Sequence, residues 1–270
     1  MPKVPERETR YLNLILTPIR ICASYKPKLG LGNKAGLSLK DFQKIYRGDP
    51  FYTWFGLDNP LMYAAHKAAG GMTSVYRQIG IGCEHLFRAI IQDELGLTEE
   101  QSRWSYSVTT ANKMRTLSLD ARIHLPAIKN ARKKRRVAGW IRDVATSMNI
   151  EPRVIETLHG SVFEVRQGYK SKDSKRQNAD IANAATAYTQ AYLPCVVLMS
   201  SQMDSDIMTR YQHEKWAILT GPPVEATPLK STYSFLKDIV GYDLAAFFES
   251  HSRKIQREVA KVLETLLKAE

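Results

Sequence analysis

The fold of this chain is decided by residues 160–169, which read GSVFEVRQGY. Successive side chains of a β-strand point to opposite faces of a sheet. Here Val162, Glu164 and Arg166 would share one face, and the residues between them would share the other. The alternation predicts a strand over residues 160–169 that carries an acid, Glu164, between two apolar neighbours.

Elements of both kinds flank this strand. Residues 115–125 alternate in hydrophobicity and predict an earlier strand, whereas the alanine-rich residues 178–192 predict a later helix. The short apolar runs at 193–200 and 216–220 are typical of buried strands. Apolar residues recur at helical spacing over 73–95, and Gly96 follows as a stop signal. This order predicts an α/β fold with a mixed central sheet flanked by helices.

The remaining segments predict three regions. Residues 1–72 form a helical N-terminal region, in which Ser38 caps one helix, Pro60 opens another, and Gly70-Gly71 interrupts the chain. Residues 73–240 form the core, with a basic insertion at about 126–150. Residues 241–270 form a final helix whose apolar stripe either docks on the core or makes a dimer contact.

Composition narrows the class of protein. The polar N-terminus does not resemble a signal peptide, and the longest apolar runs are too short to cross a bilayer. We therefore expect a soluble, cytoplasmic protein without a membrane partner. Three scattered cysteines in apolar surroundings favour buried, reduced thiols. The net charge of +12 favours a polyanionic partner, although a generally basic enzyme would also show it.

The positive charge concentrates in two clusters. Eight basic residues lie between Arg122 and Arg142, and a second group follows the central strand. Blocks of this kind neutralise phosphates, although a charge run is also common on a solvated face. The residues we expect to contact DNA are Lys129, Arg132, Lys133, Lys134, Arg135, Arg136, Lys172, Lys175 and Arg176. Trp140 and Tyr169 beside these clusters either stack on bases or belong to the core, and the core is the more common place for an aromatic residue.

Two acids lie inside apolar strands. Asp120 falls between Leu119 and Ala121, and Glu164 lies in the central strand. Burying an acid is costly unless it is paired or bound to a cation. Two carboxylates on adjacent strands would suit Mg²⁺, and such an ion can promote phosphodiester hydrolysis. The alternatives are half-exposed acids at the surface, or an ion pair with Arg166.

The order of these residues resembles a known family. A helix carries Glu84 in GIGCEHLF (80–87), one strand carries Asp120, and the next carries Glu164 in VFEVRQGYKSKDSKR (162–176). Over residues 73–222 this order is similar to the type II restriction endonucleases of the PD-(D/E)XK nuclease superfamily. The resemblance implies a Mg²⁺-dependent endonuclease that cleaves double-stranded DNA at a short specific site, commonly as a homodimer.

The same resemblance implies roles for individual residues. Asp120 and Glu164 would be the metal ligands, and Glu84 a supporting acid. The family places a lysine two residues after the glutamate, where this chain has Arg166, which cannot serve as a base. Either Arg166 only stabilises phosphate charge, or Lys170 replaces that lysine. A non-catalytic nucleic-acid-binding protein and an RNA-processing nuclease remain the alternative functions.

Overall fold

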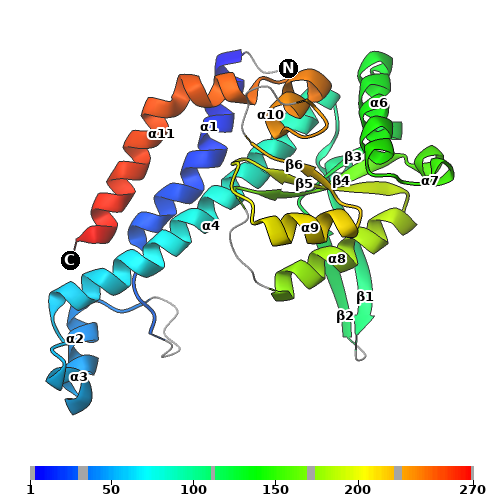
Figure 1. The fold of residues 1–270 in the computed structure, drawn as a ribbon. Coiled ribbons are helices and arrows are strands. Elements are labelled where there is room, and N and C mark those ends of the chain that lie inside the picture. Colours follow the sequence, from blue (N-terminus) through cyan, green and yellow to red (C-terminus); the bar gives the residue numbers. More distant parts are fainter. Residues whose placement is uncertain (1–3, 30–35, 111–112, 169–173, 222–226, 269–270) are drawn as a thin grey trace. The chain divides into compact units, whose positions relative to one another are not determined.

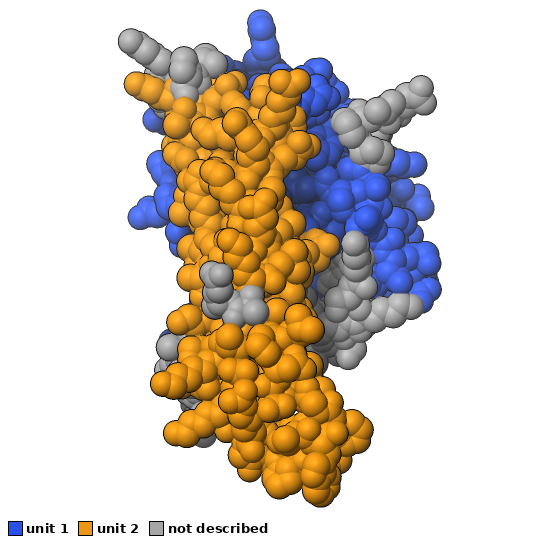
Figure 2. Space-filling model, turned by 90° about the vertical axis from the view of Figure 1, so that its left-hand side faces the viewer, with its two compact units in different colours: residues 1–4, 83–249 blue, residues 5–82, 250–270 orange. Residues whose placement is uncertain are grey.

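A computed structural model of the chain describes residues 4–29, 36–110, 113–168, 174–221 and 227–268. The chain divides into two compact units, which we describe separately (Figure 2). The first comprises residues 1–4 and 83–249, and the second comprises residues 5–82 and 250–270. The long helix α4 (Pro60–Leu95) and the last helix α11 (Leu244–Leu267) each contribute to both units.

The first unit is built on a four-stranded mixed sheet (Figure 1). Its strands are β3 (Ala121–His124), β4 (Gly160–Arg166), β5 (Tyr192–Leu198) and β6 (Ala217–Leu219), in that order across the sheet. β3 pairs antiparallel with β4, whereas β4, β5 and β6 run parallel. The α/β class and the mixed central sheet predicted from the sequence are therefore confirmed.

Helices cover both faces of this sheet (Figure 1). Val162 belongs to a cluster that includes Ala184 of α8 (Ser174–Thr189) and Ile207 of α9 (Ser205–His213). The ring of Phe163, the next residue, faces the other way and lies 5.2 Å from the Phe87 ring of α4 and 6.4 Å from the Trp140 ring. Because both faces are covered, β5 is buried along its whole length, as is typical of parallel strands.

The remaining elements of this unit lie between α4 and β4 or after β6. They are α5 (Glu99–Ser102), a hairpin of β1 (Trp104–Thr110) and β2 (Lys113–Leu119), a 3₁₀ turn (Leu125–Ala127), α6 (Ala131–Ser147), α7 (Pro152–Thr157), α10 (Thr232–Ser234) and a π-helical segment (Phe235–Val240). α5 begins with a capping box, in which the Thr98 and Gln101 side chains each bind the other's backbone.

Two predictions for this unit need correction. The predicted strand at 115–125 is interrupted at Asp120, where a bend separates β2 from β3. The predicted order also lacked α6, which fills most of the basic insertion, and α7, which follows it. α6 forms because apolar residues recur at helical spacing on its inner face, and because the Asn130 side chain accepts a hydrogen bond from the Lys133 amide at its start.

The second unit is helical, as predicted for the N-terminal region. It contains most of α1 (Val4–Ile21), α2 (Leu39–Arg47), α3 (Pro50–Trp54), the first part of α4 and the end of α11. Ser38 caps α2 and Pro60 opens α4, as the sequence predicted. Phe42, Tyr46 and Tyr63 form an aromatic core between α2 and α4.

The predicted break at Gly70-Gly71 is wrong, because α4 continues through both glycines. Their small size serves close packing within this unit. A Cβ atom on Gly70 would lie 2.0 Å from the Tyr25 hydroxyl, and one on Gly71 would lie 2.6 Å from the Leu266 side chain. Leu266 and Val262 of α11 are therefore buried within the chain, whereas the dimer contact predicted for this helix stays a prediction.

Two further expectations concern the chain as a whole. Cys22, Cys83 and Cys195 are buried free thiols, as expected. Within the described ranges, every helix is either too short or too polar to serve as a transmembrane span.

Candidate metal and nucleic-acid site

Asp120 lies at the bend between β2 and β3, where two contacts fix it. The Val165 amide donates a hydrogen bond to Asp120 Oδ2 at 2.8 Å, and the Arg88 guanidinium donates one to the Asp120 carbonyl oxygen. The antiparallel ladder of β3 and β4 ends with Ala121 opposite Phe163, so Asp120 and Glu164 each lie one residue beyond its last pair. The fold therefore brings the backbones of the two predicted acids to the same end of this ladder.

The surroundings of Asp120 disfavour its negative charge. Burial, and second to it the charge of Glu84, raises the pKa of this carboxyl to about 6. The Val165 amide and the guanidinium groups of Arg166 and Arg88 act in the opposite direction. A carboxylate held next to another negative charge in a partly dry place is stabilised by any cation that binds between them.

Glu164 has the opposite surroundings. Its side chain is buried and forms an ion pair with Arg166, whose Nη2 also lies 3.5 Å from Asp180 Oδ2 of α8. The hydroxyl of Tyr211 of α9 donates a hydrogen bond to the same Asp180 oxygen. These four side chains form a buried polar network between the sheet and its two neighbouring helices. Arg166, expected to face phosphate, is 13% exposed and is held by two carboxylates.

The sequence analysis missed Asp180 and Tyr211. A signal for Asp180 was available, because Asp180, Ala184 and Ala187 recur at positions i, i+4 and i+7 of α8 and are all buried. An acid on the apolar face of a helix requires a partner from another element. Only the fold identifies that partner as Arg166.

Glu84 lies on α4, in the part that belongs to the same unit. Its carboxylate pairs with Arg88 one turn later, with 3.3 Å between Arg88 Nη2 and Glu84 Oε1. The Glu84 side chain is partly exposed, and its charge reaches Asp120. Glu84, Arg88 and Asp120 are therefore electrostatically coupled, whereas the role of Glu84 as a supporting acid stays a prediction.

These residues offer few ligands to a metal ion. Within the described ranges, no three side chains of Asp, Glu, His or Cys gather closely enough to hold one. Mg²⁺ commonly uses only one or two protein carboxylates and completes its shell with water and substrate phosphates. Asp120 and Glu164 fit that requirement in number and in chemistry. Lys170, the candidate replacement for the family lysine, lies outside the described residues.

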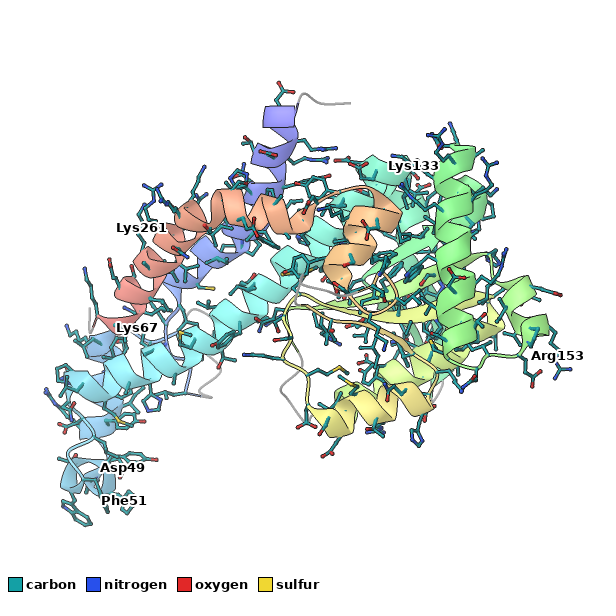
Figure 3. The ribbon with its side chains drawn as sticks, turned by 45° about the horizontal axis from the view of Figure 1, so that its top comes forward. Asp49, Phe51, Lys67, Lys133, Arg153 and Lys261 are labelled. Carbon is teal, nitrogen blue, oxygen red and sulfur yellow. The ribbon has the colours of Figure 1, made fainter. Side chains whose placement is uncertain are left out.

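The first basic cluster lies on α6 and just before it. Lys129, Arg132, Lys134 and Arg135 are exposed. Two other members, Lys133 and Arg136, bind neighbouring segments. Lys133, labelled in Figure 3, lies 3.4 Å from the Glu94 carboxylate of α4. Arg136 donates hydrogen bonds to the carbonyl oxygens of Ile239 and Val240 at 2.7 and 3.1 Å.

The other predicted DNA contacts either lie outside the described residues or are buried. Lys172 and Tyr169 lie outside the described residues, as do the side chains of Lys175 and Arg176 at the start of α8. Trp140 is a core residue and not a base-stacking one, because it is 2% exposed and its Nε1 donates to the Pro228 carbonyl oxygen at 2.7 Å.

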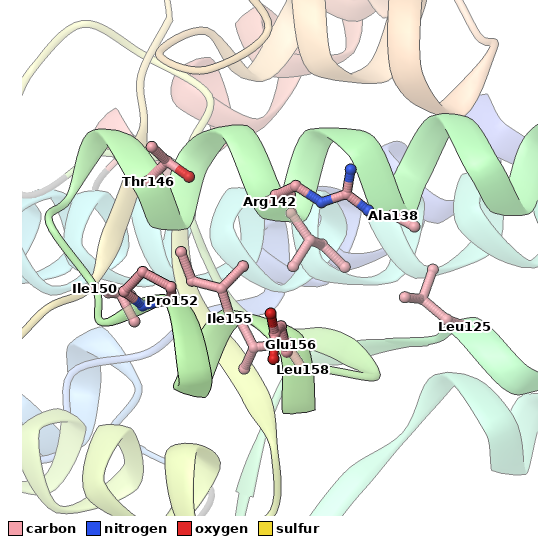
Figure 4. Close-up of a pocket in the computed structure, with 10 residues that line it drawn as sticks. Leu125, Ala138, Arg142, Thr146, Ile150, Pro152, Ile155, Glu156 and Leu158 are labelled. Atoms are coloured by element: carbon pink, nitrogen blue, oxygen red, sulfur yellow. The ribbon is translucent and has the colours of Figure 1, made fainter.

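A separate pocket of about 550 Å³ lies between α6, α7 and the 3₁₀ turn (Figure 4). Its lining is mostly aliphatic, with Arg142 and Glu156 as its charged members. It includes neither Asp120 nor Glu164. This pocket therefore has no evident part in the chemistry of the carboxylates.

The comparisons with known proteins add no family. No family model matches the chain, and neither a curated protein nor a solved structure matches it. The functional argument therefore depends on the residues of this chain alone.

Proposed function

We propose that this protein is a Mg²⁺-dependent endonuclease that cleaves double-stranded DNA. The observation that carries the proposal is the position of Asp120. It lies at the same end of the β3–β4 ladder as Glu164, and its pKa is raised by burial and by the charge of Glu84. Two acids held close together, such as Asp120 and Glu84, repel each other and destabilise the fold unless a cation or a proton binds there. Destabilised groups of this kind are characteristic of functional sites.

Phosphodiester hydrolysis requires that a water oxygen bond to phosphorus while the P–O bond to the leaving oxygen breaks. The proton of that water must pass to a base, and the leaving oxygen must gain a proton. A divalent cation held by Asp120 and Glu164 would stabilise the negative charge that develops on the phosphate. Arg166 stays charged and holds Glu164 in position, so it cannot accept the proton. Among the described residues of the site, the carboxylates are the groups able to do so.

The geometry of α4 connects the carboxylates with the basic surface. Glu84 is coupled to Asp120, and Glu94, ten residues later on the same helix, meets Lys133 of α6. Ten residues of α-helix span about 15 Å. That length corresponds to roughly four base pairs of B-DNA. In this proposal the exposed cations at the start of α6 would contact the backbone of a duplex whose scissile phosphate lies at Asp120.

One observation favours a second candidate, a nucleic-acid-binding protein without catalysis. Glu164, Arg166, Asp180 and Tyr211 already satisfy one another, so Glu164 needs no metal ion to be buried. In that case the basic residues of α6 would grip phosphates and Asp120 would have no chemical role.

The experiment incubates the purified protein with supercoiled plasmid and Mg²⁺, and compares wild type with Asp120→Asn. We expect the variant to lose at least about 100-fold in cleavage rate while it binds a DNA duplex in Ca²⁺ as wild type does. Asp238→Asn, which removes an exposed acid of the same unit, is the matched control and should cut normally.

The outcomes separate the candidates. Wild-type protein that binds the duplex but leaves the plasmid intact with Mg²⁺ would establish the non-catalytic function. Equal cleavage of single-stranded RNA would indicate an RNA-processing nuclease. If the plasmid is cut, sequencing of the new ends reports whether one short site is recognised, and light scattering with DNA reports whether the protein acts as a homodimer.

A further inference from the structure

Four aromatic side chains are exposed on the short helix α3 of the helical unit. Phe51, labelled in Figure 3, is 57% exposed, and Trp54 and Phe55 are 80% and 67% exposed. These three residues occupy positions i, i+3 and i+4, so they share one face of α3 and the residue that ends it. Tyr52, between them in the sequence, is 38% exposed. We call these four residues the α3 patch.

Ring contacts hold the α3 patch in place. The Phe51 ring lies 5.0 Å from the Phe55 ring and 5.7 Å from the Tyr52 ring. The Tyr52 ring in turn lies 4.8 Å from the ring of Tyr46, a member of the buried aromatic core of this unit. At the start of α3 the Asp49 side chain accepts a hydrogen bond from the Phe51 amide at 3.0 Å. The rings are therefore preorganised, which lowers the entropy cost of binding them.

Exposed aromatic side chains of this kind point to a partner. A cluster of large apolar side chains on the surface of a soluble protein commonly marks an interaction site. Aromatic residues are enriched at the centres of protein interfaces, where they supply much of the binding free energy. We therefore expect another molecule to cover the α3 patch.

The charge around the patch discriminates between partners. Residues 38–62 are neutral overall, whereas the whole chain carries a net charge of +12. Their charged members are Lys40, Lys44, Arg47, Asp41, Asp49 and Asp58. Nucleic acids and anionic membranes bind surfaces with an excess of cations, which this surface lacks. A second copy of this basic chain, in contrast, can approach with least repulsion where the surface is neutral.

The size of the patch also suits a pair of copies. A fully buried aromatic side chain removes about 150 to 250 Å² from water. At exposures from 38% to 80%, the four rings would cover about 500 Å² on each copy. Two copies would then bury about 1,000 Å², which is the lower limit for a specific interface before any neighbouring side chain contributes.

We propose that two copies of this chain form a symmetric homodimer through the α3 patch. In a two-fold interface the same surface meets itself, so the rings of one copy would pack on the same rings of the other. This contact differs from the one predicted for α11. The α3 patch shares no residue with the acids at β3 and β4, so the inference goes beyond the proposed function and stands whether or not the protein cleaves DNA.

The test measures the mass of the full chain without DNA by sedimentation equilibrium, at protein concentrations from about 1 to 100 µM. We expect a dimer whose Kd rises at least about 100-fold in Trp54→Ser/Phe55→Ser, because both rings would lie at the centre of the interface. Both side chains are exposed, so this variant should fold. Met114→Ser removes an apolar side chain of β2 that is 77% exposed, and this matched control should dimerise as wild type does.

A charge swap tests whether the patch meets itself. Trp54→Lys alone and Trp54→Glu alone should each stay monomeric, because like charges would face each other in the pair. An equal mixture of the two should associate at least about tenfold more tightly than either variant alone, because opposite charges would then meet. No gain on mixing would overturn the symmetric contact.

The remaining outcomes are equally distinct. A wild type that stays monomeric up to the highest concentration would overturn the proposal, as would an equal loss of dimer in Met114→Ser. A dimer that is lost in Leu267→Ser but kept in Trp54→Ser/Phe55→Ser would place the contact on α11 instead. A monomeric wild type that binds duplex DNA or lipid vesicles through the patch would assign another occupant and overturn the dimer. Asp120→Asn should dimerise as wild type does, which keeps this result separate from that of the cleavage experiment.

Discussion

Asp120 and Glu164 lie at the same end of the ladder between β3 and β4, yet the surroundings of the two acids differ. Glu164 is neutralised by Arg166 within a buried network, whereas Asp120 is crowded by Glu84 and has a raised pKa. The ion pair of Glu164 thus stabilises the unit, whereas the charge of Asp120 destabilises it. The difference identifies Asp120 as the better reporter of function, because its charge is not needed for folding.

The largest expected effect comes from removing the charge of Glu164, the neutralised acid. Glu164→Gln leaves Arg166 with Asp180 as its remaining carboxylate in a buried place, and loss of one partner of a buried pair is costly. We expect the free energy of unfolding in urea to fall by about 3 kcal/mol. The control, Glu151→Gln, breaks an exposed pair with Arg153 and should cost under about 0.5 kcal/mol. Equal effects of the two substitutions would show that the Glu164 network is not a buried ion pair.

Removal of the Asp120 charge should instead raise the free energy of unfolding. The pKa of Asp120 is raised to about 6 in the folded protein, so the folded state binds an extra proton between about pH 4 and 6. Stability contributed by this group is therefore lost as the pH rises through that window. Asp120→Asn keeps an oxygen for the Val165 amide and should be more stable than wild type at pH 7 by about 1 to 2 kcal/mol.

The same variant gives its own control when unfolding is measured across pH. The difference between wild type and Asp120→Asn should vanish below about pH 4, where both side chains are neutral in both states. A variant that is less stable than wild type at pH 7 would mean that the Asp120 carboxylate is structural, and would remove the contrast with Glu164.

Local patterns predicted much of this fold, because they depend on neighbouring residues only. The cap at Ser38, the stop at Gly96 and the alternating strand around Glu164 are signals of this kind. Helix α6 was missed because the charge run at 132–136 concealed the apolar spacing of Val137, Trp140, Ile141 and Val144 that follows it.

The candidate site was predictable only in part, for a physical reason. That Asp120 and Glu164 require partners follows from their apolar neighbours in the sequence. Which partners they have depends on contacts between distant elements, because Asp180 and Tyr211 come from two helices, α8 and α9, that pack on the sheet. The role of Gly70 likewise depends on a distant residue, because it packs against Tyr25, which is 45 residues away in the sequence.

The smallest expected effect tests why the pKa of Asp120 is raised. Burial is the larger cause and the charge of Glu84 the second, so Glu84→Gln should lower the pKa of Asp120 only part of the way toward its ordinary value. Carboxyl carbon chemical shifts followed by NMR across pH 3 to 8 would measure the change, with Asp143→Asn on the exposed face of α6 as the control. An unchanged pKa would place Glu84 outside the electrostatic reach of Asp120. It would then leave burial alone as the reason why this acid differs from Glu164, and would remove Glu84 from the proposed site.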